Sequence, residues 1–238
     1  LVELMWAPLP DARLLRLLLE HGADPNVRDS DGTTPLHDFV HDTTGVRLLL
    51  DHGADVGATD GYGATVLYKA ASWGARSSVL LLLDRGADVD ARNDDGSTPL
   101  HAAAWKGESR VAGVLLDHGA AVDARNDDGD TPLHRAIARG QGKAAQLLIE
   151  RGADVNAPNG AGQPPLAHVR GENDLTDLEV STLTRLLTQR GALGEKIRLL
   201  ADGGQPAPGS VVEEGRIREV VYVGMVTRYI VDLERGGA

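Results

Sequence analysis

The sequence predicts an all-α solenoid, in which short helix pairs stack in a row. Two repeated signals support this prediction. The tetrapeptide Thr-Pro-Leu-His occurs three times, starting at Thr34, Thr98 and Thr131. A Gly-Ala pair recurs at a step of 33 residues, at Gly86, Gly119 and Gly152. Each Gly-Ala pair follows an apolar run with helical spacing, so one period holds a turn, a short helix and a longer helix.

Each repeat carries the residues that favour the ends of helices. Thr98 and Thr131 can act as N-caps, because a threonine hydroxyl accepts a hydrogen bond from a free N–H of the first turn. Pro99 and Pro132 follow them, at the first helical position, where the missing N–H costs nothing. Gly119 comes after a longer apolar run, where a left-handed C-cap favours glycine. The sequence thus predicts where the short helices begin and where the longer helices end.

Together, Thr-Pro-Leu-His and the later Gly-Ala-Asp-Val-Asn/Asp-Ala, at this period, resemble the ankyrin repeat over roughly residues 1–192. The resemblance implies about six units, each a helix–turn–helix with a β-turn or hairpin, of which the first and the last act as caps. It also implies that His37, His101 and His134 hydrogen-bond to backbone between units.

The first three units depart from the repeat pattern. Residues 1–7 and 14–19 are expected to form the helices of a capping unit that has no Thr-Pro pair. The second unit is two residues short, and we expect the loss in the helix–helix turn near His41. The third unit has Tyr68 in the position of the histidine, where we expect a packing role.

Of the later units, the fourth and fifth follow the repeat pattern and the sixth departs from it. Residues 93–125 and 126–158 follow the pattern closely. The sixth unit keeps the proline and the leucine but loses the threonine and the histidine. A polar insertion at 170–177 precedes its last expected helix, at 178–189. Terminal repeats are commonly atypical because one of their faces meets water, so we interpret this unit as the C-terminal cap.

The repeat pattern ends after residue 192. Residues 193–215 contain a Gly- and Pro-rich stretch and are expected to form a linker. Residues 216–238 hold two runs of β-branched residues and predict a β-hairpin tail. About 20 residues of this tail also resemble part of the TOBE module of ABC-importer ATPases, although the chain contains no phosphate-binding Gly-x-x-x-x-Gly-Lys-Ser/Thr motif.

The composition argues against several classes of function. The net charge of −11 disfavours nucleic acid as a partner, because phosphates need a basic surface. The chain contains no cysteine, which fits a reducing cytoplasm and leaves no thiolate for catalysis or metal binding. Charged residues interrupt the apolar stretches near the start, so we expect no signal peptide and no membrane span. Abundant Arg, Ala and Gly with few Lys suggest a bacterial protein, and the lack of cysteine suggests a cytoplasmic one.

The recurring polar residues predict no catalytic or metal site. His37, His101 and His134 are at least one repeat apart, about 10 Å or more by helix packing, so we interpret them as structural. Aspartates gather at turn tips, where their side chains bond local backbone, and residues 127–130 lack the closing glutamate of a calcium loop. No nucleophile elbow and no zinc-protease motif occurs. We therefore expect no enzyme activity, no cofactor and no metal.

Partner-binding residues are expected where the repeat varies. The resemblance implies that hairpin tips and the ends of the first helices line the concave side. Aromatic residues make up only 3% of the chain, yet Tyr62, Trp73 and Trp105 fall at these positions in neighbouring units, as binding hot spots would. Alternatively, these rings pack against adjacent hairpins and stiffen the stack. The predicted partner-binding residues are Tyr62, Trp73, Asp94, Asp95, Ser97, Trp105, Lys106, Asp127, Asp128, Asp130 and Arg139.

The function that we expect is non-catalytic binding of a protein, one with a basic surface because the turn-tip aspartates form an acidic rim. Two alternatives stay open. One is a small-molecule-binding or atypical catalytic protein, which a deep apolar pocket at Tyr68, Lys69 and Trp73 would support. The other is a self-assembling structural module, a homodimer through residues 216–233, because a lone two-stranded hairpin is marginal in water.

Overall fold

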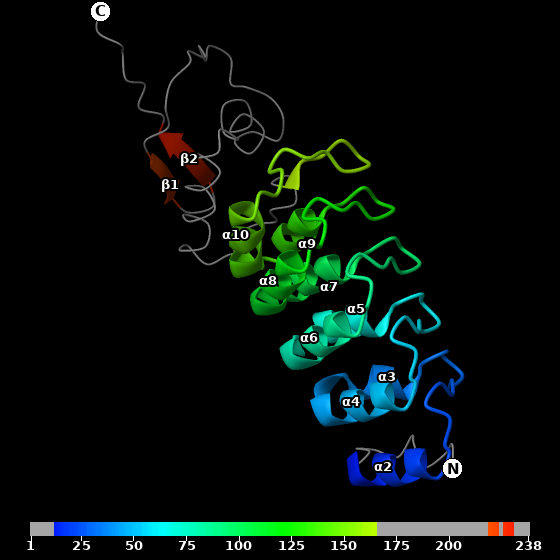
Figure 1. Ribbon diagram of the computed structural model, residues 1–238. Helices are drawn as coiled ribbons and strands as arrows, with labels where there is room; N and C mark the ends of the chain where they lie inside the picture. The colour runs from blue at the N-terminus through cyan, green and yellow to red at the C-terminus, as the bar shows by residue number, and fades with distance from the viewer. Residues whose placement is uncertain (1–11, 166–218, 224–225, 231–238) are drawn as a thin grey trace, which may run out of the picture. The chain divides into compact units, whose positions relative to one another are not determined.

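A computed structural model describes residues 12–165 and two short segments, 219–223 and 226–230. The helices belong to one compact unit, residues 1–174. In that unit, the described helices form two rows: an inner row and an outer row (Figure 1). The bounds of the inner row are α3 Pro35–Asp38, α5 Val66–Ser72, α7 Pro99–Lys106 and α9 Pro132–Ala138. Those of the outer row are α2 Ala12–Glu20, α4 Thr43–Asp51, α6 Arg76–Asp84, α8 Ser109–Asp117 and α10 Gly142–Glu150.

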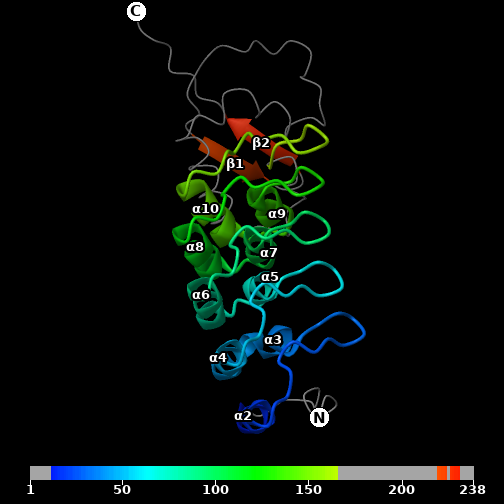
Figure 2. The same ribbon diagram turned by 45° about the vertical axis from the view of Figure 1, so that its right-hand side comes forward.

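Consecutive helices contact each other within each row, and each inner helix contacts the outer helix of its own unit. The hairpins that join one unit to the next project beside the inner row, on the side away from the outer row (Figure 2). The described part of this unit therefore has the helical, repeated architecture that the sequence predicts. The inner helices and the hairpin tips together line one surface, which we call the inner surface.

Leucines at repeated positions form the core of the array. Within Thr-Pro-Leu-His and its equivalents, the leucine is fully buried in each described unit; these are Leu36, Leu67, Leu100 and Leu133. The outer helices contribute a second buried series: Leu49, Leu82, Leu115 and Leu148. Alanines fill the close contacts between neighbouring inner helices, as Ala103 and Ala104 do in α7. Each helix pair thus buries its apolar side against the next pair.

Threonine starts the inner helices, as predicted. Thr98 is the N-cap of α7, and its backbone N–H donates to Nδ1 of His101 at 3.1 Å. The other imidazole nitrogen, Nε2, donates to the carbonyl oxygen of Asp130 in the next unit at 3.0 Å. His37 and His134 make the same contacts, to Ala64 at 3.2 Å and to Gln163 at 3.0 Å. The expectation that these histidines join units through backbone is confirmed.

The second unit is shortened near His41, as the sequence predicts. Helix α3 ends at Asp38 after only four residues, and a 3-10 turn, η1 Phe39–His41, continues it. The ring of Phe39 packs against Gly45 of α4, where an added Cβ would lie 2.0 Å from a ring carbon. Because this glycine leaves room for the ring, the shortened unit still closes its core.

Backbone hydrogen bonds join consecutive hairpin tips into a ladder. Each donates from an N–H of one tip to a carbonyl oxygen of the preceding tip: Gly61 to Asp31 (2.7 Å), Asp94 to Tyr62 (3.0 Å), Asp127 to Asp95 (3.1 Å) and Gly160 to Asp128 (2.8 Å). Gly129, in one of these tips, has a positive φ of 75°. The ladder holds the tips in fixed register along the inner surface.

The hairpin segment belongs to a second compact unit, residues 175–238. Strand β1 Glu219–Val223 pairs antiparallel with β2 Val226–Ile230, with Val221 opposite Arg228. How this unit associates with other chains stays a prediction.

Several expected features lie outside the described residues. They are the first helix at residues 1–7, the insertion at 170–177, the helix at 178–189, the boundary at 192 and the linker at 193–215. The total of six units therefore also stays a prediction.

Candidate functional site

Tyr62 lies at a hairpin tip, and its side chain is 75% exposed. The carboxylate of Asp60 accepts hydrogen bonds from the backbone N–H groups of Tyr62 (2.9 Å) and Ala64 (3.0 Å). The carbonyl oxygen of Tyr62 accepts from Asp94 in the next tip. The backbone at Tyr62 is therefore held on both sides while the ring reaches water.

Trp73 is the C-cap residue of α5, and it is 61% exposed. Its ring meets that of His41 edge to face, with centroids 5.4 Å apart and an angle of 77° between the planes. His41 belongs to the preceding unit, so a neighbouring repeat supports the exposed indole. Such edge-to-face contacts stabilise aromatic pairs modestly, by about 0.5–1.5 kcal/mol.

Trp105, near the end of α7, is only half-buried. Two guanidinium groups of the α9 unit lie over its ring, those of Arg139 at 4.4 Å and Arg135 at 5.5 Å from the centroid. Cation–π contacts of this kind hold the indole to the next repeat. Trp105 thus packs against the next unit and is still partly exposed, while its role in binding a partner stays a prediction.

The acidic residues at the tips form a rim beside these rings. Asp94, Asp95, Asp127 and Asp128 are exposed, as are Lys106 and Arg139. Arginines offset part of the negative charge. Arg92 pairs with Asp127 at 2.9 Å, and Arg135 pairs with Asp128 at 3.3 Å.

Ser97 and Asp130 were expected on this surface, but the structure buries both, at 4% and 9% exposure. The reason is local. Their backbone N–H groups donate to the side-chain oxygens of Asn93 (2.7 Å) and Asn126 (2.8 Å), which closes the necks of the hairpins. The Asp130 carboxylate also accepts from Asn159 in the next unit at 3.0 Å. Both residues therefore take part in the hydrogen bonds that stabilise the hairpins.

A small hollow of about 170 Å³ opens between α5, α7 and the α9 unit. Its lining residues are Tyr68, Asp95, Ser97, His101, Trp105 and Arg135. Both ring nitrogens of His101 are already hydrogen-bonded, and burial lowers its pKa to about 4. Burial also raises the pKa of Tyr68, and the nearby Asp95 carboxylate raises it further.

Lys69 and Trp73 do not line this hollow. Lys69 instead pairs with Asp38 at 3.7 Å, and Trp73 contacts His41. The group that the sequence analysis missed is Arg135. It directly follows the histidine position of the repeat, where other units hold Asp38, Lys69 or Ala102. This variation within a constant stretch is the signal that could have identified it.

Neither a membrane-crossing helix nor a metal-binding group was found where the structure describes the chain. No helix there is long and apolar enough to cross a membrane. No cluster of three or more His, Asp or Glu side chains among the same residues could hold a metal ion.

In a comparison with known protein families, one family model matches most of the array. A family model described as ankyrin repeats (3 copies) matches residues 4–93 and 86–159, which together are more than half of the chain. A search of curated proteins gives no match.

Proposed function

Because the chain belongs to the ankyrin-repeat family, we propose that it is a non-catalytic module that binds a protein partner on its inner surface. Ankyrin repeats are generally protein–protein interaction modules, and the family is typically non-catalytic. The described array supplies the usual basis for such binding, a series of hairpins and inner helices in fixed register. A partner that docks on side chains already held in place loses little conformational entropy at this surface.

The observation that carries the proposal is the exposure of Tyr62 and Trp73. They and Leu17 are the exposed large hydrophobic residues of the described chain. Both rings belong to the third unit and lie on the inner surface, where the backbone ladder holds Tyr62 and His41 supports Trp73. Exposed aromatic rings on an ordered backbone are typical binding hot spots.

Charge and shape narrow the class of partner. The aspartates of the rim favour a basic surface opposite them, which increases the rate and the specificity of association. The hollow beside Trp105, at about 170 Å³, is smaller than the roughly 300–1,000 Å³ typical of small-molecule sites. It suits one partner side chain, and this size favours a protein partner over a small-molecule ligand.

Alanine variants test this proposal. We expect Tyr62→Ala with Trp73→Ala to weaken the partner by about 1–4 kcal/mol per hot-spot residue, while the thermal unfolding temperature stays near that of the wild type. The measurement is capture of partners from native cytosol, followed by calorimetry with the captured protein. Leu17→Ala is the matched control, because it removes an exposed apolar residue from the outer row. Equal capture by all three proteins would contradict the proposal.

A second candidate function is self-association through residues 216–233. Among the described residues, β1 pairs only with β2, so each strand has a second edge that could add a strand from another chain. Light scattering on the full chain and on a chain without residues 203–238 separates the two functions. A dimeric mass that depends on the tail supports self-association, whereas one monomeric mass for both proteins contradicts it.

A further inference from the structure

Asn159 is the only asparagine of the chain that precedes a glycine. It begins the last described hairpin tip, at the position that Asn93 and Asn126 occupy in the two preceding units, where aspartate follows. Asparagine is a thermolabile residue, because the next backbone nitrogen attacks its side-chain carbonyl carbon and expels ammonia. A glycine in the next position has no side chain to hinder this attack. The pair Asn159–Gly160 is therefore the most labile of these sites by its covalent chemistry.

In the closed tip, hydrogen bonds hold both nitrogens of this reaction. The attacking nitrogen, that of Gly160, donates its hydrogen to the carbonyl oxygen of Asp128 at 2.8 Å. The departing nitrogen, Nδ2 of Asn159, donates to Oδ1 of Asp130 at 3.0 Å. The oxygen of the same carboxamide accepts from the N–H of Ala161 at 3.0 Å. These bonds keep the attacking amide protonated and the carboxamide fixed, so the reaction requires the tip to open.

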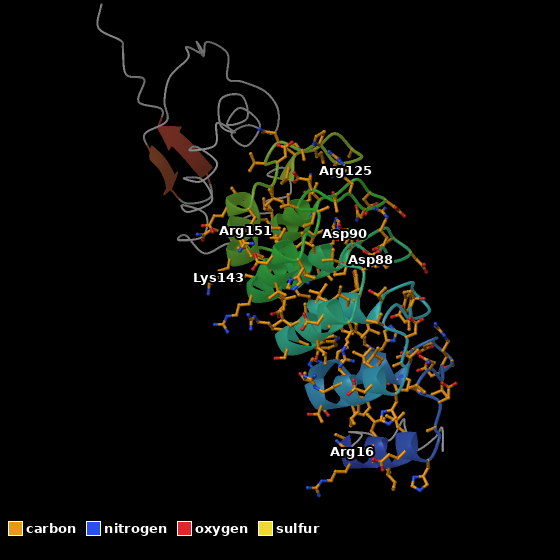
Figure 3. The ribbon with its side chains drawn as sticks, in the orientation of Figure 1. Arg16, Asp88, Asp90, Arg125, Lys143 and Arg151 are labelled. Atoms are coloured by element: carbon orange, nitrogen blue, oxygen red, sulfur yellow. The ribbon has the colours of Figure 1, made fainter. Side chains whose placement is uncertain are left out.

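The end of this tip is suited to local opening. Residues 160–163 are all exposed, so few buried contacts support the ladder bond of Gly160. Such bonds open at a lower free energy than global unfolding requires. The chain before Asn159 is held more firmly. Arg125, which Figure 3 shows at these hairpins, donates to the carbonyl oxygens of Gly129 (3.2 Å) and Pro158. The rate of reaction at Asn159 therefore depends on how often the ladder bond opens.

Loss of ammonia at Asn159 places a second carboxylate against Asp130. The new carboxylate has an oxygen where Nδ2 now donates to Asp130, which is only 9% exposed. Two carboxylates at this distance repel each other, most strongly where little water surrounds them. Arg135 offsets only part of the repulsion, because it is shared between Asp130 at 3.6 Å and Asp128 at 3.3 Å. The reaction thus replaces a hydrogen bond between units with a repulsive contact.

Asp130 makes this tip different from the others. For Asn126, the residue equivalent to Asp130 is Ser97. For Asn93 it is Ala64, so neither asparagine has a carboxylate at the equivalent position. The second and third units have aspartate itself in place of the asparagine. An amide is therefore needed at position 159 for a reason that does not apply to the earlier tips.

We propose that Asn159–Gly160 is a site of spontaneous deamidation, and that the reaction frees the last described tip from the hairpin ladder. The Gly160 nitrogen bonds to Cγ of Asn159, the bond from Cγ to Nδ2 breaks, and Nδ2 leaves as ammonia with the proton of Gly160. Water then opens the cyclic succinimide at either carbonyl, which gives aspartate or isoaspartate. Isoaspartate lengthens the main chain by one atom, so Gly160 no longer meets Asp128 in register.

The test follows deamidation in the full chain during incubation in mildly alkaline buffer. Peptide mapping by mass spectrometry, with synthetic aspartate and isoaspartate standards, gives the rate at each asparagine. We expect Asn159 to react at least about tenfold faster than Asn93 and Asn126, because glycine follows only Asn159. No product at Asn159, or equal rates at the three positions, would overturn the proposal.

Two glycine variants test whether opening of the ladder limits the reaction. Gly129→Ala places a Cβ 2.5 Å from the nitrogen of Gly160, whereas Gly119→Ala, also at positive φ, meets nothing within 4 Å. We expect the first variant to speed the reaction at Asn159 by about fivefold and the second by less than about twofold. Equal rates in the two variants would contradict a reaction through the open tip.

Asn159→Asp reproduces the aspartate product and tests its effect on stability. We expect it to lower the thermal unfolding temperature, because two carboxylates then meet in the neck of the hairpin. Asn93→Asp is the matched control and should lower it less, since alanine stands there at the position of Asp130. In an Asp130→Ser background, Asn159→Asp should cost less than it does in the wild type. Equal losses in the two aspartate variants, or an unchanged loss in the serine background, would overturn the role assigned to Asp130.

Discussion

At the residue scale, the hydrogen bonds of buried His101 favour its neutral form. In His101, Nδ1 accepts from the N–H of Thr98, and Nε2 donates to the carbonyl of Asp130. A second proton on Nδ1 would face an N–H donor and would place a charge in the core. Burial accordingly lowers the pKa of His101 to about 4 and also lowers that of His37.

This pKa predicts a pH dependence of stability. The unfolded pKa of histidine is about 6.5, so below that pH the unfolded chain binds a proton that folded His101 does not. The stability contributed by neutral His101 is therefore complete above pH 6.5. It is lost progressively as the pH falls from about 6.5 to 4, by about 3 kcal/mol in total.

Urea unfolding at a series of pH values measures this effect, with His101→Gln as the comparison. The glutamine variant should be less stable at pH 7.5 and should lose less of its free energy of unfolding between pH 7 and 4.5. Parallel pH curves for the two proteins would show that His101 does not titrate as stated.

A second residue-scale prediction concerns Asn126, whose buried Nδ2 has no hydrogen-bond partner among the described residues. One repeat further on, Nδ2 of Asn159 donates to Asp130 at 3.0 Å. The residue equivalent to Asp130 is Ser97, whose shorter side chain leaves Asn126 without an acceptor. We expect Ser97→Asn to raise the free energy of unfolding by about 1 kcal/mol. Ser97→Ala is the control, and a gain in both variants, or in neither, would rule out this explanation.

At the scale of the element, the hairpin ladder orders the inner surface. Each tip donates one backbone hydrogen bond to the preceding tip, so the spacing of the tips follows from main-chain geometry. Side chains reinforce it. Arg92 reaches the carbonyl of Arg125 at 2.6 Å, and Arg125 donates in turn to the carbonyl of Pro158. We therefore expect the exposed rings on this scaffold to tolerate substitution without a change in the stack.

Replacing a tip glycine with alanine tests whether the hairpin ladder stabilises the array. At Gly129 the φ is 75°, and an added Cβ would lie 2.5 Å from the backbone nitrogen of Gly160 in the next tip. Gly119 has φ 90° but nothing within 4 Å of its Cβ position. Both alanine variants incur left-handed strain of about 1–2 kcal/mol, and Gly129→Ala should cost about 1 kcal/mol more because it displaces a ladder hydrogen bond. Equal losses in urea unfolding would show that the ladder contributes nothing.

At the scale of the whole molecule, the 33-residue period was sufficient to predict the helix pairs. Thr-Pro at helix starts and glycine after the outer helices are local signals, and the described array follows them. The burial of Ser97 and Asp130 was not predictable in the same way, because it depends on asparagines that close each hairpin neck and on a contact with the next unit. The stacking of Arg135 and Arg139 on Trp105 is likewise a contact between units. Such a contact cannot be predicted from the sequence of a single repeat.

The difference between local sequence signals and contacts between units also applies to the proposed site. Tyr62 and Trp73 could be located from the sequence because they fall at variable positions of the repeat, and both are exposed in the structure.

The most direct test of the central claim is photo-crosslinking from the inner surface. A photoreactive phenylalanine analogue replaces Trp73 in one protein and Leu17, on the outer row, in another, and each is irradiated in native cytosol. The account predicts that position 73 captures a discrete partner protein that unlabelled wild type competes away, while position 17 does not. Capture at position 17 and none at position 73 would contradict it.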